Sequence, residues 1–194
     1  MKVPLVLLVY ALVLAVSRMA FRHRDCLRTE PDGAPRPGRW RGALLCLLPL
    51  AMMQLIPFFE YMLRFRGFLG PPLPGPPLLI PATAGSGLLV FAAGTALAAV
   101  ASRQLGRAWR ESPGALFTGG LYSVVRHPMY AGYLVQGLGC LLMLGAIWSW
   151  ALYGLAVPFM FGRIAVEDRE LAELFPEEFK AYRARIRRLV PLVF

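Results

Sequence analysis

The residues from Met129 to Gly162 form a run of 34 residues without a charged side chain. A single helix of that length would measure about 50 Å, whereas the hydrocarbon core of a bilayer is about 30 Å thick. Two shorter helices that cross the membrane in opposite directions account for the run better than one. We therefore expect a helical hairpin that turns near residues 147–150.

Three further apolar blocks precede this run, at residues 3–21, 43–63 and 78–101, and the charged residues gather between them. Charged side chains make up 16% of the chain, whereas ordinary soluble domains carry about 25%. The sequence therefore predicts an all-α integral membrane protein with about five transmembrane helices. The composition excludes a disordered chain, a coiled coil and a disulfide-stapled secreted domain.

The first two blocks each need an argument of their own. Residues 3–21 form either a signal peptide or a retained anchor. We favour the anchor, because one lysine precedes the block and no clean cleavage site follows it. Pro49 and Pro57 interrupt the second block, and membrane helices tolerate such prolines as kinks. Residues 70–77 are nearly all proline or glycine, so they form a loop.

The third block carries small residues at helical spacing, namely Gly87, Gly94 and Ala98. Faces of this kind let two membrane helices approach closely, because no side chain separates the backbones. We expect the helix over residues 78–101 to pack tightly against a neighbour.

The distribution of arginine predicts the orientation of the chain. The net charge is +10, and arginines concentrate in residues 22–41, in residues 102–127 and in the tail after residue 162. Basic loops stay in the cytoplasm. Five spans with the amino terminus outside satisfy this rule and leave the basic segments in the cytoplasm, and we expect the membrane to be a bacterial or archaeal inner membrane. Nucleic-acid binding is disfavoured, since that function needs a solvated basic face interleaved with aromatic residues.

Few side chains are suited to metal binding or disulfide formation. The three cysteines, Cys26, Cys46 and Cys140, lie far apart, and the two histidines are His23 and His127. This inventory suggests neither a disulfide framework nor a zinc site, so we expect no metal.

The segment 120–132, GLYSVVRHPMYAG, marks the entry to the hairpin. Because proline disfavours the α conformation in the residue before it, the helix should begin at Pro128, with His127 in the preceding turn. The N–H groups of a first helical turn bind a carboxylate or phosphate, and Tyr122 and Tyr130 offer flat surfaces for an adenine or ribose. The alternative is an interfacial belt that anchors a helix end at the lipid headgroups.

Arg163, Glu167 and Asp168 form a second charged group, at the far end of the hairpin. Arg163 and Glu167 lie one helical turn apart, so they form either an ordinary helix salt bridge or part of a site at the end of an apolar span. Folding the hairpin brings this group and the segment 120–132 to the same face of the membrane.

The tail continues this helix to Leu174, and Phe175-Pro176 then breaks it. Pro176 is suited to the first position of a new helix, with acidic residues in its first turn. Its apolar residues recur every three or four positions and form one stripe: Phe179, Tyr182, Ile186 and Leu189. We expect a cytoplasmic amphipathic helix that lies on the membrane surface or packs over the mouth of the bundle.

Residues 106–191 resemble the isoprenylcysteine carboxyl methyltransferase and phospholipid methyltransferase superfamily of integral membrane enzymes. The pattern is G-x-Y-x-x-V-R-H-P-x-Y-x-G, a hydrophobic hairpin, R-x-x-x-E-[ED]-x-x-L-x-x-x-F and a late proline. Here it occupies residues 120–132, 163–175 and Pro191. The resemblance implies one integrated domain, in which a three-helix membrane region (1–101) precedes a cofactor-binding methyltransferase region (102–194).

The resemblance implies that S-adenosylmethionine binds between the R-H-P-x-Y segment and the glutamate that follows the hairpin. The positions that match the cofactor site are Leu116, Phe117, Tyr122, His127, Pro128, Met129, Tyr130 and Glu167. Arg163 matches the substrate-binding arginine of the carboxyl methyltransferase branch, and we expect Arg163 and Glu167 to be the catalytic pair. Residues 114–117 depart from the commoner His-x-Leu-Val, and Pro176 and Phe179 replace a usual glycine and tyrosine.

The methyl acceptor has several candidates. A methyl sulfonium is already activated, so its transfer depends on positioning more than on acid–base groups. A carboxylate acceptor would pair with Arg163 through two parallel hydrogen bonds, while Glu167 meets the amino group of the cofactor. An amine acceptor needs a base, which Glu167, Asp168 or His127 would supply. We favour an isoprenylcysteine-type carboxylate over an ethanolamine headgroup, a thiol or a non-enzymatic membrane scaffold.

Overall fold

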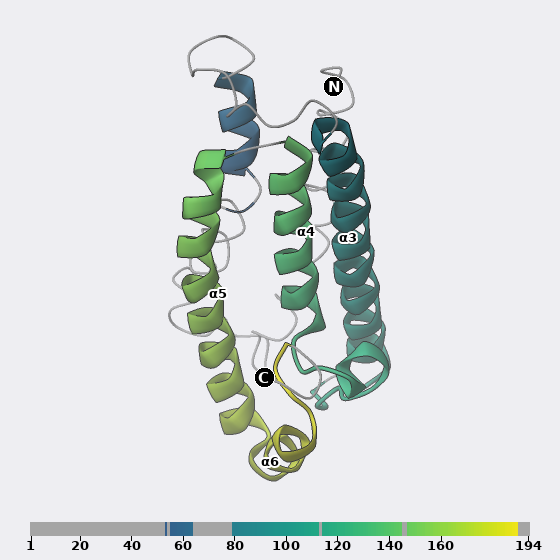
Figure 1. The fold of residues 1–194 in the computed structure, drawn as a ribbon. Coiled ribbons are helices and arrows are strands. Elements are labelled where there is room, and N and C mark those ends of the chain that lie inside the picture. Colours follow the sequence, from purple (N-terminus) through teal and green to yellow (C-terminus); the bar gives the residue numbers. More distant parts are fainter. Residues whose placement is uncertain (1–52, 54, 64–78, 113, 145–146, 190–194) are drawn as a thin grey trace. The chain divides into compact units, whose positions relative to one another are not determined.

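The computed structural model describes residues 53, 55–63, 79–112, 114–144 and 147–189. A short helix covers residues 55–63, and the labelled elements are α3 (Leu79–Glu111), the 3-10 helix η2 (Gly120–Ser123), α4 (Pro128–Leu144), α5 (Ile147–Leu174) and α6 (Pro176–Arg185) (Figure 1). The regular elements among the described residues are therefore helices, as predicted. The first predicted span and the proline-rich loop lie outside them.

The described residues fall into two compact units, to which α3, α4 and α5 each contribute residues. We call residues 95–131 and 167–189 the polar unit, and residues 53–63, 79–94 and 132–166 the apolar unit. The motif that begins α4 and the acidic end of α5 both belong to the polar unit. The domain boundary expected at residue 101 stays a prediction.

Two of the described helical segments are long and apolar enough to cross a membrane, Gly85–Glu111 and Trp148–Leu174. The intervening α4, Pro128–Leu144, is apolar and shorter; at 17 residues it measures about 26 Å. Large apolar side chains stay exposed on α5, among them Trp148, Leu155 and Phe159. Exposed apolar side chains of this kind are consistent with helices that face lipid.

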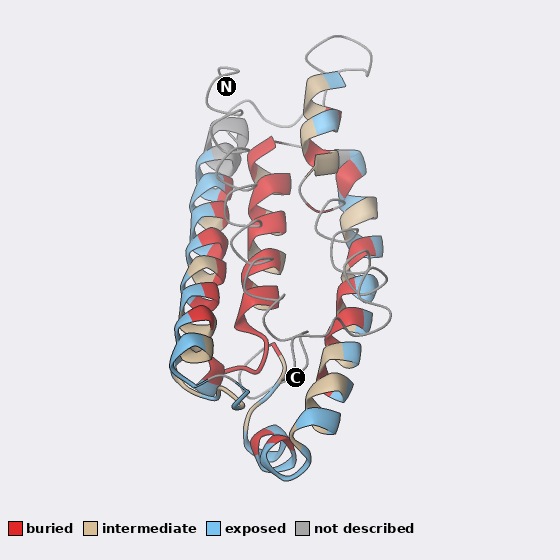
Figure 2. Ribbon diagram, turned by 180° about the vertical axis from the view of Figure 1, so that it is seen from behind, coloured by how far each residue is buried: buried red, intermediate tan, exposed pale blue. Residues whose placement is uncertain are grey.

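Within the apolar unit, glycine allows α3 and α4 to touch through their backbones. A Cβ atom added at Gly87 or Gly94 would collide with the backbone of α4 at Met143 or Gln136, and one added at Gly139 would collide with the backbone nitrogen of Phe91. The close approach predicted from Gly87 and Gly94 is confirmed. Helix α4 is buried along nearly its whole length (Figure 2).

Replacing Gly139 with Ala should therefore destabilise the protein. The added methyl group has no room beside the backbone of Phe91, so α3 and α4 must separate, at a cost of about 3 kcal/mol. Gly154→Ala is the matched control, because no atom lies within 4 Å of its added Cβ. The free energy of unfolding in detergent measures both variants, and equal stability would contradict this account of the contact.

The start of α5 corrects the predicted position of the hairpin turn. Helix α5 begins at Ile147, so residues 147–150 are helical rather than part of the turn. The carboxylate of Glu60 accepts hydrogen bonds from the backbone N–H groups of Trp148, at 3.1 Å, and Ser149, at 2.8 Å. The Ser149 hydroxyl donates a third, at 2.6 Å. A carboxylate distant in sequence thus caps the helix, which no local pattern indicated.

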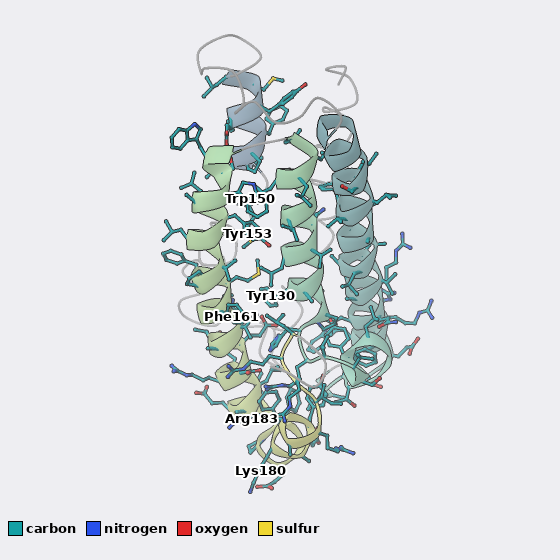
Figure 3. The ribbon with its side chains drawn as sticks, viewed as in Figure 1. Tyr130, Trp150, Tyr153, Phe161, Lys180 and Arg183 are labelled. Carbon is teal, nitrogen blue, oxygen red and sulfur yellow. The ribbon has the colours of Figure 1, made fainter. Side chains whose placement is uncertain are left out.

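A tyrosine also joins α5 to α4 within the apolar unit. Tyr153 points from α5 towards α4 (Figure 3), and its hydroxyl donates to the carbonyl oxygen of Leu134 at 2.7 Å. The two helices of the predicted hairpin are thus joined by a side chain as well as by apolar packing.

The end of α3 differs from the prediction. The apolar block was expected to stop at residue 101, with a loop over residues 102–127, but α3 continues through Glu111. Residues 102–111 are mostly good helix formers such as arginine, glutamine and alanine, so the helix outlasts its apolar composition. The connecting segment is accordingly shorter than expected.

The tail confirms one expectation and corrects another. Helix α5 ends at Leu174 and α6 begins at Pro176, as the Phe175-Pro176 pair predicted. The apolar stripe, however, is helical only as far as Arg185, and Ile186 is extended. Beyond it, Arg187 forms a parallel bridge with Val125. Backbone pairing with a distant segment therefore replaces the last helical turn.

Candidate functional site

The entry to α4 has the predicted geometry. Helix α4 begins at Pro128, and His127 precedes it. The carbonyl oxygen of His127 accepts the first helical hydrogen bond, from the N–H of Ala131 at 3.1 Å. His127, Pro128, Met129 and Tyr130 are all buried. Proline thus sets the start of the helix and fixes His127 just outside it.

The aromatic residue Tyr122 lies on η2, before α4. Its ring meets the ring of Phe117 edge to face, with centroids 5.4 Å apart, while Leu116 is half-buried nearby in sequence. Gly120 has a φ of +57°, and a Cβ there would collide with the amide of Gln104. The same amide accepts a hydrogen bond from the N–H of Leu121 at 2.9 Å. Gln104 therefore holds the turn that presents Tyr122.

Asp168 is the centre of the polar unit. Its Oδ1 atom accepts hydrogen bonds from Nη1 of Arg126 at 3.0 Å and lies 2.9 Å from Nε2 of His127. Its Oδ2 atom accepts from Nε of Arg188 at 2.9 Å. One carboxylate thus joins the end of α5, the start of α4 and the tail. Asp168 is itself 5% exposed, so these bonds are largely shielded from water.

Tyr130 and Glu167 form a second link between α4 and α5. The Tyr130 hydroxyl donates to Oε2 of Glu167 at 2.7 Å, and the Tyr130 ring meets the His127 ring edge to face at 5.7 Å. Glu167 is half-buried. The two groups that the hairpin was expected to bring together, residues 120–132 and the acidic end of α5, do lie together.

The Arg126 side chain carries a buried positive charge. It is 8% exposed, and its guanidinium lies over the ring of Phe179 at 5.7 Å. Burial lowers the pKa of Arg126, while the Asp168 carboxylate opposes that shift. Arginine nevertheless remains protonated in proteins. Arg126 and Asp168 therefore form a charged pair.

The tail is attached to this site by backbone and side-chain hydrogen bonds. The N–H groups of Arg126 and His127 donate to the carbonyl oxygens of Arg187, at 2.7 Å, and Arg188, at 2.9 Å. The Tyr182 hydroxyl donates to the carbonyl oxygen of Tyr122 at 2.6 Å. Burial raises the pKa of Tyr182, which keeps this hydroxyl protonated.

Arg163 belongs to the apolar unit, whereas Glu167 belongs to the polar unit. Both lie on α5, one helical turn apart, and Arg163 is 3% exposed. Ionisable side chains that are this deeply buried at the end of an apolar segment typically mark functional positions. Its expected role in binding substrate stays a prediction.

Sequence reasoning gave no specific role to several residues that hold the site together: Gln104, Arg126, Asp168, Tyr182 and Arg188. Asp168 appeared as a member of the charged group at the end of the hairpin and as one possible base. The signal for an ion-pair network was present, since a single aspartate at the end of an apolar helix is followed by an arginine-rich tail. Which arginines pair with it depends on the tertiary structure.

The helices and the polar cluster around Asp168 together define the class of this protein. In the part of the chain that the structure describes, the regular elements are helices, two of them long and apolar enough to cross a membrane, and a polar site is built from the start of α4 and the end of α5. Residues 83–178 match the sequence profile of the phospholipid methyltransferase family. The chain belongs to that family.

Three named relatives are similar to parts of the chain. The first is protein-S-isoprenylcysteine O-methyltransferase of Schizosaccharomyces pombe, 34% identical over 79 residues, or 40% of this chain and 34% of the relative. Methanethiol S-methyltransferase 1 of Bradyrhizobium diazoefficiens is 34% identical over 71 residues, 37% and 24% of the two chains. Protein-S-isoprenylcysteine O-methyltransferase B of Arabidopsis thaliana is 33% identical over 85 residues, 43% of each.

The chain matches less than half of the length of each of these relatives. No solved structure matches it significantly. The three relatives are all named as methyltransferases, and their names give different methyl acceptors.

Proposed function

We propose that this protein transfers a methyl group from S-adenosylmethionine to a lipophilic acceptor in the membrane. The acceptor that we favour is an isoprenylcysteine-type carboxylate. The single observation that carries the proposal is the joining of the R-H-P-x-Y segment to the acidic end of α5 through Tyr130–Glu167 and Asp168. The orientation expected from the arginine distribution supports a site on the cytoplasmic side, where the water-soluble cofactor is available.

The side chains present fit S-adenosylmethionine. Glu167 is a half-buried carboxylate held by a hydroxyl, and a carboxylate accepts about four hydrogen bonds, so it suits the ammonium group of the amino-acid end. The aromatic pair Phe117 and Tyr122 suits the adenine ring. When bound, the cofactor supplies a methyl group on a positively charged sulfur, which needs no further activation.

The residues of the chain then have to bind and orient the two reactants. Positioning alone contributes a large part of the barrier reduction in such a transfer. Glu167 orients the amino-acid end of the cofactor. Arg163 holds an acceptor carboxylate through two parallel N–H···O bonds. No proton has to leave an ionised carboxylate before methylation, so this branch requires no base.

The named relatives define the alternatives. Two of them are isoprenylcysteine methyltransferases and one is a methanethiol methyltransferase, whereas the family name refers to phospholipids. An ethanolamine amine or a thiol must lose a proton during transfer. Asp168 is a poor base for this, because three donors already occupy its oxygens. The occupied oxygens of Asp168 thus argue against one of the three bases that an amine or a thiol acceptor would need, and to that extent support our choice of the carboxylate.

Two measurements test the proposal. Calorimetric titration of S-adenosylmethionine into the detergent-purified protein should show saturable binding. Transfer of a labelled methyl group should then occur to a prenylated cysteine analogue and not to phosphatidylethanolamine or methanethiol. Absence of binding would reject the methyltransferase assignment, whereas transfer to the amine or the thiol alone would reject the carboxylate.

Replacing Arg163 with Lys should separate acceptor binding from cofactor binding. Lysine keeps the charge but not the planar two-point contact, so methyl transfer to the prenylated analogue should fall about tenfold or more at saturating cofactor. Cofactor affinity should change little. Arg169→Lys, on the exposed face of α5, is the matched control. Unchanged turnover in the Arg163 variant would exclude the carboxylate clamp.

A further inference from the structure

We propose that Asp168 is the positioning residue of His127. Held ionised by Arg126 and Arg188, it keeps an imidazole proton on Nε2, so that in the neutral form of the ring Nδ1 is a hydrogen-bond acceptor. This inference rests on the proposed function, and it adds the class of group that His127 takes: a hydroxyl or amino donor of the bound cofactor, not its carboxylate.

The first step concerns the charge of Asp168. Two guanidinium groups bond to it from opposite sides, Arg126 at Oδ1 and Arg188 at Oδ2. Arginine is protonated throughout the ordinary pH range, and a guanidinium beside a carboxylate favours the ionised form. The side chain of Asp168 is 6% exposed, so water screens these contacts little. Asp168 is therefore a carboxylate that only accepts hydrogen bonds.

The second step concerns the proton on the imidazole. Nε2 of His127 lies 2.9 Å from Oδ1 of Asp168. Since the carboxylate has no proton to give, Nε2 has to be the donor. In a neutral imidazole the other nitrogen is then an acceptor, because one nitrogen carries the proton and the other the lone pair. Asp168 thereby determines the hydrogen-bonding character of Nδ1.

The third step concerns the orientation of the ring. The backbone N–H of His127 donates to the carbonyl oxygen of Arg188 at 2.9 Å, and its own carbonyl oxygen accepts from Ala131. The ring of Tyr130 packs against the imidazole at 5.7 Å. The backbone and one face of His127 are thus fixed, and Asp168 fixes one ring nitrogen. In metal sites, a hydrogen bond from the second ring nitrogen fixes the tautomer and the orientation of a histidine ligand. We infer that the hydrogen bond to Asp168 does the same for His127.

The tautomer of His127 can be measured directly, because the chain contains two histidines and His23→Gln leaves one. Protein with isotope-labelled histidine gives the nitrogen shifts of His127 by NMR, recorded without cofactor at the alkaline plateau of those shifts, where the ring is neutral. The parent should show the Nε2–H tautomer alone. Asp168→Asn should show both tautomers, since an amide group either donates or accepts.

Glu167→Gln is the matched control, because it alters the neighbouring carboxylate and leaves the Asp168–His127 contact intact. This variant should keep the tautomer of the parent. S-adenosylmethionine affinity, measured by calorimetry, should fall about two- to tenfold in Asp168→Asn, the effect of one ordinary hydrogen bond.

The parent alone provides a test that does not depend on whether the variant folds. An Nδ1–H tautomer in the parent, or an unchanged tautomer in Asp168→Asn, overturns the inference. Failure of the parent to bind S-adenosylmethionine would instead reject the proposed function, and the two failures are therefore distinguishable.

Discussion

Asp168→Asn is expected to lower the free energy of unfolding by about 3 kcal/mol. The substitution removes a negative charge that two arginines and a histidine share, and it leaves the guanidinium of Arg126 buried with no carboxylate beside it. Breaking a buried ion pair from one side costs about 3–5 kcal/mol. The lower end of this range applies here, because the Arg188 side chain is 35% exposed. Water therefore screens the ion pair between Arg188 and Asp168.

Thermal unfolding in detergent measures this effect. For a chain of this size the midpoint should fall by about 6–12 °C. Glu173→Gln is the control, since Glu173 is an exposed carboxylate on the same helix and its loss should change the stability by about 0.5 kcal/mol at most. Equal midpoints in the two variants would show that Asp168 does not hold the polar unit together.

Glu167→Gln is expected to leave the fold stable and to weaken S-adenosylmethionine binding about ten- to a hundredfold. In the parent the Tyr130 hydroxyl donates to the Glu167 carboxylate at 2.7 Å. The amide oxygen of glutamine still accepts this hydrogen bond, so the link between α4 and α5 persists. What disappears is the charge that attracts the ammonium group, and a hydrogen bond to a charged partner contributes about 1.5–3 kcal/mol.

Tyr130→Phe serves as the comparison for this variant. It removes the hydroxyl that holds Glu167 and keeps the carboxylate, so the affinity should fall less than in Glu167→Gln. Calorimetric titration gives both affinities, and the midpoint of thermal unfolding shows whether the proteins are folded. If Glu167→Gln binds the cofactor like the parent, Glu167 is not the ammonium ligand.

The predicted elements that the structure confirms depend on local chemistry. Proline placed the start of α4 at Pro128 and the start of α6 at Pro176, because it fixes φ and lacks an N–H group wherever it occurs. The apolar run after Met129 produced two helices, since its length exceeds one span. Glycine at helical spacing produced the close contact of α3 and α4, because only the absence of a Cβ matters there.

The elements that the sequence missed depend on partners far along the chain. Glu60 sets the start of α5 from 88 residues away, and the backbone of residues 126–127 pairs with the tail and ends the predicted helical stripe. A local pattern contains no information on either partner. These are hydrogen bonds that any carboxylate or any extended segment could make, so only the folded chain selects them.

The sequence by itself determined the apolar helices, the two chemical motifs and, through them, the family. The tertiary structure decided how the motifs are used. It assigned Glu167 to Tyr130 and placed Asp168 beside Arg126, His127 and Arg188, residues 42, 41 and 20 positions away. The sequence alone does not distinguish the roles of the two acids, because they are adjacent on one helix and carry the same charge. Their different positions around the helix axis, and the donors that the fold brings to each, give them different hydrogen-bond partners.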